Sequence, residues 1–280
     1  MNRLQLIFSL ALAAASVLCT SASSAQQSFY GSVRGHNASM ADLQPTWMGP
    51  LNQSDGRLGQ AFRFSVSNLK LGDAHVFDYG NNHGVSMIVQ RRFQLDLNPP
   101  SFFRNHSSSM KDGFGNASTQ VKMRIASGNA QHGNFAVSAV LFHGFGPRAY
   151  QNLMLTPYYV PSIAAGKAFG RFAVLTTVGG FMPTSKIAEQ GRAVEWNLTG
   201  QAHVNSHLWL DVENNATWFK AGPFDGKAQN FITPAAFYMI RRKEWKPEHS
   251  SVVFACGMQT ATSSFHYYNH NLITEMRVIF

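Results

Sequence analysis

Charged residues are scarce in this 280-residue chain, at 13% of the sequence, about half the ~25% of a typical soluble protein. Hydrophobic residues nevertheless make up 45%, so the chain is not a disordered polar tail. Beyond the N-terminus, no run reaches the ~18 consecutive apolar residues of a membrane helix. The sequence therefore excludes a helical membrane protein. It leaves a soluble β protein or a β structure whose outer surface faces something other than water.

Cysteine is nearly absent as well. Met1 to Arg3 is a short positive start and Leu4 to Leu18 is apolar, which predicts a secretory signal peptide over residues 1–25. The mature chain then begins at Gln26 and retains Cys256 as its only cysteine. No intramolecular disulfide can form, so an exported protein of this kind depends on hydrogen bonding and burial for its stability.

Alternation with a period of two is the main pattern along the chain. In residues 120–125, 193–205 and 208–218, charged or amide side chains alternate with large apolar ones. Successive side chains of a strand point to opposite faces, so each segment predicts a strand with one polar and one apolar face. Several segments exceed the ~5–6 residues common in soluble sheets and fit the ~9–11 needed to cross a bilayer at a tilt.

The remaining candidate strands complete a barrel. They cover residues 62–67, 84–97, 134–145, 151–163, 170–182, 228–241, 250–262 and 270–280. Pro157 and Pro234 argue against regular strands in two of them. Envelope barrels normally have an even number of strands, and residues 28–36 are a possible twelfth. The competing architecture is a soluble sandwich, whose strands also alternate.

The predicted fold is thus all-β: an antiparallel transmembrane β-barrel of about twelve strands, within roughly ten to fourteen, with short periplasmic turns and longer extracellular loops. The barrel is expected to span residues 60–280. Residues 26–59 are rich in Pro, Gly and Asn and can form a plug, a first strand or an arm. With the C-terminus on the periplasmic side, the tight turn at 205–207 is periplasmic and the long connection at 98–114 is extracellular.

The inward faces of these strands supply candidate lumen-lining residues. These are Arg63, Arg92, Asp96, Lys122, Arg124, Glu195, His203, Asp211, Glu213, Glu275 and Arg277. Cations and carboxylates are nearly balanced, so strong ion selectivity is not expected. The set fits either an ion-pair network that closes the barrel, since unpaired buried charges are costly, or the polar wall of a narrow pathway.

The last strand resembles the C-terminal recognition signal of bacterial outer-membrane β-barrels. Apolar residues alternate up to a terminal aromatic residue: Leu272, Met276, Val278 and Phe280. The resemblance implies insertion into outer-membrane lipid by the barrel-insertion machinery.

A second resemblance lies within the chain. Asp112-Gly-Phe-Gly-Asn116 followed by Gln120-Val-Lys-Met-Arg124 resembles the strand opening of putative outer-membrane transporters grouped with the phenol-degradation MetA-pathway proteins, with Asn116 where Asp is usual. That resemblance implies passive passage of small, often hydrophobic or aromatic, molecules. A structural or adhesive barrel that transports nothing is the alternative.

Other chemistries find little support in the sequence. His106 and Ser108 have the His-x-Ser spacing of outer-membrane phospholipases, but Gln120 stands about where that family has an orienting Asn. His203 and His207 flank a predicted turn instead of sharing a helical face. We therefore expect no enzyme, no metal and no other cofactor. Export argues against a nucleic-acid partner despite the net charge of +9.

Overall fold

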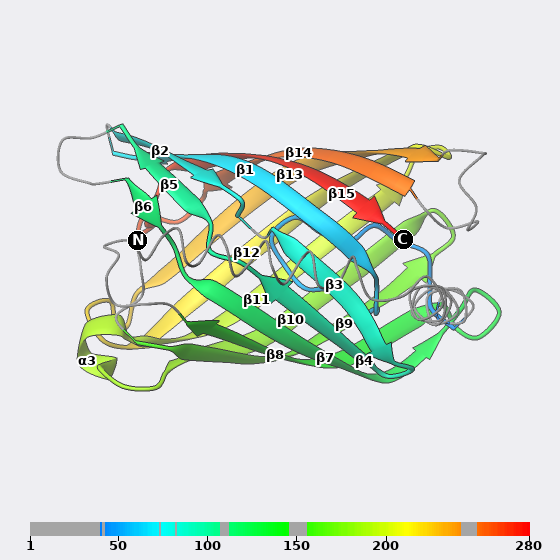
Figure 1. Ribbon diagram of the computed structural model, residues 1–280, viewed down its shortest axis with the longest axis horizontal. Helices are drawn as coiled ribbons and strands as arrows, with labels where there is room; N and C mark the ends of the chain where they lie inside the picture. The colour runs from blue at the N-terminus through cyan, green and yellow to red at the C-terminus, as the bar shows by residue number, and fades with distance from the viewer. Residues whose placement is uncertain are drawn as a thin grey trace, which may run out of the picture.

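The structure is a computed structural model, and it describes residues 40, 43–72, 74–81, 83–106, 112–145, 156–241 and 251–280. These residues form a closed antiparallel barrel of twelve strands, which confirms the predicted fold class (Figure 1). In these ranges, no helix is long and apolar enough to cross a membrane. The predicted signal peptide, the candidate strand at 28–36 and Ser108 lie outside the described residues.

The elements follow one another along the chain with few long connections. They are β1 (Ala61–Leu71), β2 (Ala74–Tyr79), β3 (Gly84–Gln90), β4 (Phe93–Asn98), β5 (Phe102–Asn105), β6 (Gly113–Phe114), β7 (Ala117–Gly128), β8 (Phe135–Phe145), β9 (Tyr158–Phe169), β10 (Phe172–Pro183), α3 (Ile187–Gln190), β11 (Arg192–His203), β12 (Leu208–Ala221), β13 (Ala228–Arg241), β14 (Ser251–Ala261) and β15 (His270–Ile279).

The barrel closes where its first and last strands pair. β1 and β15 are antiparallel from Ala61 opposite Ile279 to Lys70 opposite His270. Three barrel strands each consist of two segments. The first is β2 with β3, which both pair with β1. The second is β5 with β4, which pair with β2 and β3, and the third is β6 with β7, which pair with β5 and β4. Fifteen segments therefore make twelve barrel strands, and the pairing of β1 with β15 removes the long open edges that a flat sheet would have.

The two ends of the barrel differ in their connections. At the end that holds Phe280, which we call the C-terminal end, short turns lie at 91–92, 170–171 and 204–207. The opposite end, which we call the loop end, carries the longer connections 184–191, 222–227 and 262–269. The connections at 72–73, 129–134 and 242–250 are the exceptions. This asymmetry is typical of periplasmic turns and extracellular loops.

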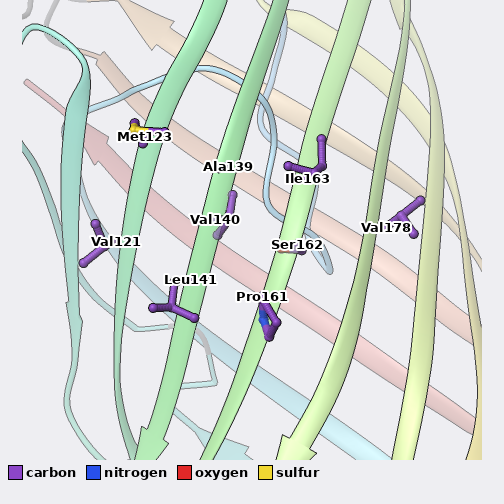
Figure 2. A pocket seen from close by; sticks show the side chains of 9 residues that line it. All are labelled: Val121, Met123, Ala139, Val140, Leu141, Pro161, Ser162, Ile163 and Val178. Atoms are coloured by element: carbon purple, nitrogen blue, oxygen red, sulfur yellow. The ribbon is translucent and has the colours of Figure 1, made fainter.

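The exterior of the barrel is apolar. Phe62 and Phe64 on β1 and Leu210 on β12 are among its exposed side chains, as expected for a surface that meets hydrocarbon. Figure 2 shows a part of this surface over β7 to β10, where larger side chains surround a smaller alanine and leave a groove of about 500 Å³. Its outward-facing lining consists of Val121, Met123, Ala139, Leu141, Pro161, Ile163 and Val178.

Three expected segments differ from the structure. The strand expected at 151–163 is β9 at Tyr158–Phe169, so Pro157 precedes the strand and does not lie within it. Residues 84–97 form a hairpin and not one strand, because the chain turns at residues 91–92 between β3 and β4. Arg92 is therefore exposed in a turn at the C-terminal end of the barrel. The expected loop at 98–114 contains β5 and β6, which extend the wall at the loop end.

Pro234 lies inside β13, although it was expected to argue against a regular strand there. The strand runs through Pro234, and only its pairing with β14 is affected, breaking after Ile232 and resuming at Ala235. A proline lacks the N–H that a ladder requires, but the pairing of Val212 with Pro234 keeps β12 and β13 in register. The doubt that Pro234 raised about this strand was wrong.

Candidate functional site in the barrel lumen

Residues 43–60, which we call the luminal segment, lie inside the barrel, where they form part of the blue trace in Figure 1. The segment contacts walls on several sides. A Cβ atom on Gly56 would lie 2.7 Å from the Ala136 carbonyl oxygen of β8 and 3.0 Å from that of Ala164 on β9. Across the lumen, the Leu51 side chain packs beside Gly257 of β14. The segment therefore contacts opposite sides of the lumen.

Side chains of the wall bind the backbone of the luminal segment. The Glu213 carboxylate of β12 accepts hydrogen bonds from the backbone N–H groups of Leu51, at 2.5 Å, and Asn52, at 3.0 Å. The Arg277 guanidinium of β15 donates to the carbonyl oxygens of Gly49 and, at 2.9 Å, Pro50. An extended chain inside a lumen needs partners for its backbone groups, and these charged side chains provide them.

Amide and hydroxyl side chains continue this pattern. Gln201 of β11 both accepts from the Met48 N–H, at 3.0 Å, and donates to the Met48 carbonyl, at 2.6 Å. Further along the segment, Thr177 of β10 donates to the Ser54 carbonyl at 2.6 Å, and Ser138 of β8 donates to the Gly56 carbonyl at 2.6 Å. The anchors thus come from strands on different sides of the barrel.

A charged cluster holds the part of the segment next to β7. Asp55 pairs with Arg57 at 3.1 Å and with Lys122 at 4.0 Å, and Lys122 also donates to the Arg57 carbonyl at 3.0 Å. Burial raises the pKa of Asp55, but the two cations and the hydrogen bonds from Arg57 outweigh burial and lower that pKa to about 2. Asp55 is therefore ionised at neutral pH.

The wall also has an apolar part, which the alternation of charged residues did not reveal. Trp47, Met48 and Leu51 of the luminal segment belong to one buried cluster with inward-facing side chains of the barrel. The large members from the barrel are Leu175, Trp209, Phe237, Val253 and Ile273. Apolar packing thus adds to the hydrogen bonds that hold the luminal segment.

The structure gathers most of the candidate lumen residues on the inward face of the barrel. Asp96, Lys122, Arg124, Asp211, Glu213, Glu275 and Arg277 are buried. Arg63, Glu195 and His203 are partly buried, whereas Arg92 is exposed. Glu275 and Arg277 form an ion pair with each other, and the His203 ring stacks on Trp209 with centroids 3.9 Å apart.

The residues that resemble an insertion signal lie on the other face of β15. Leu272 is exposed, and Met276, Val278 and Phe280 are partly buried, while Asn271, Glu275 and Arg277 between them are buried. This alternation is the geometry that the sequence pattern predicts for a strand between lipid and lumen.

A chain of polar side chains at the loop end of the lumen was not among the sequence-based candidates. Asn215 donates to Asn197 at 2.8 Å, Gln259 donates to Asn215 at 3.1 Å, and the Tyr268 hydroxyl donates to Gln259 at 2.6 Å. Burial raises the pKa of Tyr268, which keeps this hydroxyl protonated. The inward parity of Asn197 and Asn215 was readable from the sequence, but the partners from β14 and its following loop were not.

The residues considered earlier for a phospholipase-like site and for a metal site have other surroundings. The Gln120 side chain hydrogen-bonds Asp96 and Ser54 in the lumen, whereas the His106 ring packs against Phe77 with centroids 5.5 Å apart. Among the described residues, no three His, Cys, Asp or Glu side chains lie close enough to hold a metal ion.

Two solved structures of bacterial outer-membrane proteins are similar in fold to this chain. The COG4313 outer membrane channel from Pseudomonas putida F1 aligns with a TM-score of 0.53 and 13% identity, over 84% of this chain and all of that one. The NanC porin aligns with a TM-score of 0.51 and 8% identity, over 79% of this chain and 98% of that one. This likeness is one of fold, a closed antiparallel β-barrel. No protein-family model and no curated protein matches the sequence.

Proposed function

We propose that the protein is a channel of the bacterial outer membrane, exported by a signal peptide, that passes small solutes through its lumen. The observation that carries this proposal is the polar inward face of a closed barrel. Several of its buried polar atoms, including Arg63 Nε, Asn116 Oδ1 and Gln229 Oε1, have no hydrogen-bond partner in the protein. Because buried polar groups in folded proteins are nearly always hydrogen-bonded, such atoms bind water, and a hydrated lumen is a pathway for solutes.

The width of the barrel supports the same proposal. Barrels of about 8 strands are filled by their own side chains, and barrels of about 16–18 leave an aqueous channel. Twelve strands enclose an intermediate space, which the luminal segment occupies toward the C-terminal end. Passage of a solute then requires the luminal segment to move or to leave a gap beside it. The resemblance to MetA-pathway transporters favours small hydrophobic or aromatic solutes.

The alternative is a structural barrel that transports nothing. The hydrogen bonds from Glu213, Arg277 and Gln201 to the luminal segment favour it, because they close the lumen with partners from several strands. An enzymatic role is not proposed, since Gln120 is bound within the lumen and does not orient His106. Lipid of the outer membrane and the insertion machinery remain the other proposed partners, with no role for nucleic acid.

Conductance of the purified protein in planar bilayers separates the two candidates. The wild type is compared with a variant that lacks residues 26–57, and folding of both is checked by heat-modifiable migration in gels. We expect larger conductance and faster solute entry into liposomes for the shortened variant. If the folded variant passes neither ions nor solutes, the barrel is structural and the channel proposal fails.

A further inference from the structure

Four buried oxygen atoms without partners lie close together on the lumen wall. They are Ser65 Oγ and Ser67 Oγ on β1, Asp78 Oδ1 on β2 and Asn271 Oδ1 on β15. Each of the four residues is more than nine-tenths buried, with exposures of 2%, 1%, 6% and 4% in that order. We call them the oxygen patch.

Strand register shows how compact the oxygen patch is. Ser67 is directly opposite Asp78 on one side and Ile273 on the other, and directly opposed residues have Cβ atoms ~4.5–5.5 Å apart. Asn271 is diagonal to Ser67, at ~7–8 Å, and Ser65 is two residues along the same strand, at ~7 Å. All four oxygens therefore surround the Ser67 position.

The oxygen patch faces the lumen. Asn271 shares its face of β15 with Glu275 and Arg277, and the Arg277 guanidinium binds carbonyl groups of the luminal segment. On β1, the residue before the patch points the other way, since Phe64 is exposed on the exterior, and Val66 between Ser65 and Ser67 has the same parity as Phe64. A solute reaches these buried oxygens only by displacing the groups that cover them.

No cation of the described residues pairs with the patch. Asp78 is absent from the ion pairs formed by these residues, and its carboxylate has a hydrogen bond from Ser101 only. Arg63 lies two residues before Ser65 on the same face of β1. Arg277 binds Glu275 and the luminal segment, and Lys122 binds Asp55. A buried carboxylate without a cation is unfavourable, and none of the described residues supplies Asp78 with one.

We infer that the oxygen patch binds the ammonium group of a small solute, with Asp78 as the counter-ion and the hydroxyl and amide oxygens as acceptors of its N–H groups. An ammonium group has three donors and no acceptor, which fits a patch of a carboxylate, two hydroxyls and an amide oxygen. Val76 and Ile273 border the patch as buried apolar side chains, so the ammonium can carry a short apolar chain. This inference rests on the proposed channel and names a class of solute for it.

Calorimetric titration of the purified protein in neutral detergent with propylammonium chloride tests the inference. Sodium propionate has a chain of similar length and the opposite charge, and potassium chloride supplies a cation without N–H donors. We expect binding of propylammonium, no binding of propionate, and no competition by potassium at the same concentration. Binding of propionate, or equal competition by potassium, would contradict an ammonium site.

Substitutions localise the site. Asp78→Asn should weaken binding at least about 10-fold, because hydrogen bonds to charged groups are the stronger ones, and Ser67→Ala should weaken it about 2- to 10-fold. Asp225→Asn changes the same charge on an exposed residue between β12 and β13 and should leave binding unchanged. Folding of each variant is checked by heat-modifiable migration. Equal binding by wild type and folded Asp78→Asn would overturn the assignment.

The outcome is separable from that of the channel proposal. If the protein conducts but does not bind propylammonium, the ammonium site is wrong and the channel stands. If propylammonium binds through Asp78 while the variant without residues 26–57 does not conduct, the channel proposal fails and the site stands.

Discussion

Glu213→Gln should release the luminal segment without unfolding the barrel. Glu213 is fully buried and accepts two backbone hydrogen bonds, from Leu51 and Asn52. A glutamine offers one oxygen and would place its NH₂ group against the second N–H donor. The loss of one hydrogen bond to a charged acceptor amounts to about 1.5–3 kcal/mol, or about a 10- to 150-fold larger population of the released segment.

Hydrogen exchange measured by mass spectrometry on peptides from residues 43–60 tests this expectation, because local opening controls the exchange of buried amides. Exchange of the luminal segment should accelerate by a factor in that range, while peptides from the strands keep their rates. Glu189→Gln, at an exposed position in α3, is the matched control. Unchanged exchange of residues 43–60 in Glu213→Gln would refute the idea that this carboxylate anchors the segment.

Three further perturbations probe the same lumen. Arg277→Met leaves the buried Glu275 without its ion-pair partner and should lower the free energy of unfolding by about 3–5 kcal/mol; urea unfolding measures this, and adding Glu275→Gln should recover part of the loss. Gly56→Ala puts a methyl group 2.7 Å from the Ala136 carbonyl and should displace the luminal segment, at a cost of about 1–3 kcal/mol, with higher conductance in planar bilayers. Gly59→Ala, where a Cβ meets nothing within 4 Å, should leave conductance unchanged. Because the pKa of Asp55 in the folded protein is about 2, below its ordinary 3.8, its contribution is complete above pH 4 and is lost as pH falls toward 2. Proteolytic cleavage of residues 43–60 by pepsin should accordingly rise steeply between pH 4 and pH 2 in wild type and remain flatter in Asp55→Asn.

The strands were predictable where one face is polar and the other apolar. β11 and β12 carry Glu195, Asp211 and Glu213 on one face and Trp196 and Leu210 on the other, so a period of two assigns both the strands and their orientation. The hairpin of β3 and β4 was not predictable in the same way. Its turn at residues 91–92 is a pair of arginines, without the Gly, Asn or Pro that mark most turns, and the alternation continues across it.

The wall of the lumen was predictable only in part. The alternation of charged and apolar residues identifies the charged side chains that face inward. Leu175, Phe237 and Val253 also face inward, but nothing in their own strands distinguishes them from residues that face lipid. Their inward position becomes favourable only because Trp47, Met48 and Leu51 pack against them. That contact joins segments more than a hundred residues apart, which no local pattern encodes.

Polar inward-facing residues occur both in a channel and in a barrel closed by its own chain, and the luminal segment shows why. Residues 43–60 have no regular strand pairing, so their backbone groups need side chains of the wall as partners. Glu213, Arg277, Gln201 and Lys122 supply those partners, and they are the same kinds of residue that would line a hydrated pathway. Ser67 Oγ, Asp78 Oδ1 and Asn271 Oδ1 of the oxygen patch, by contrast, have no partner among the described residues. The residues that bind the luminal segment and the residues of the oxygen patch are different ones, so the released-segment and ammonium-binding experiments test the two sets independently.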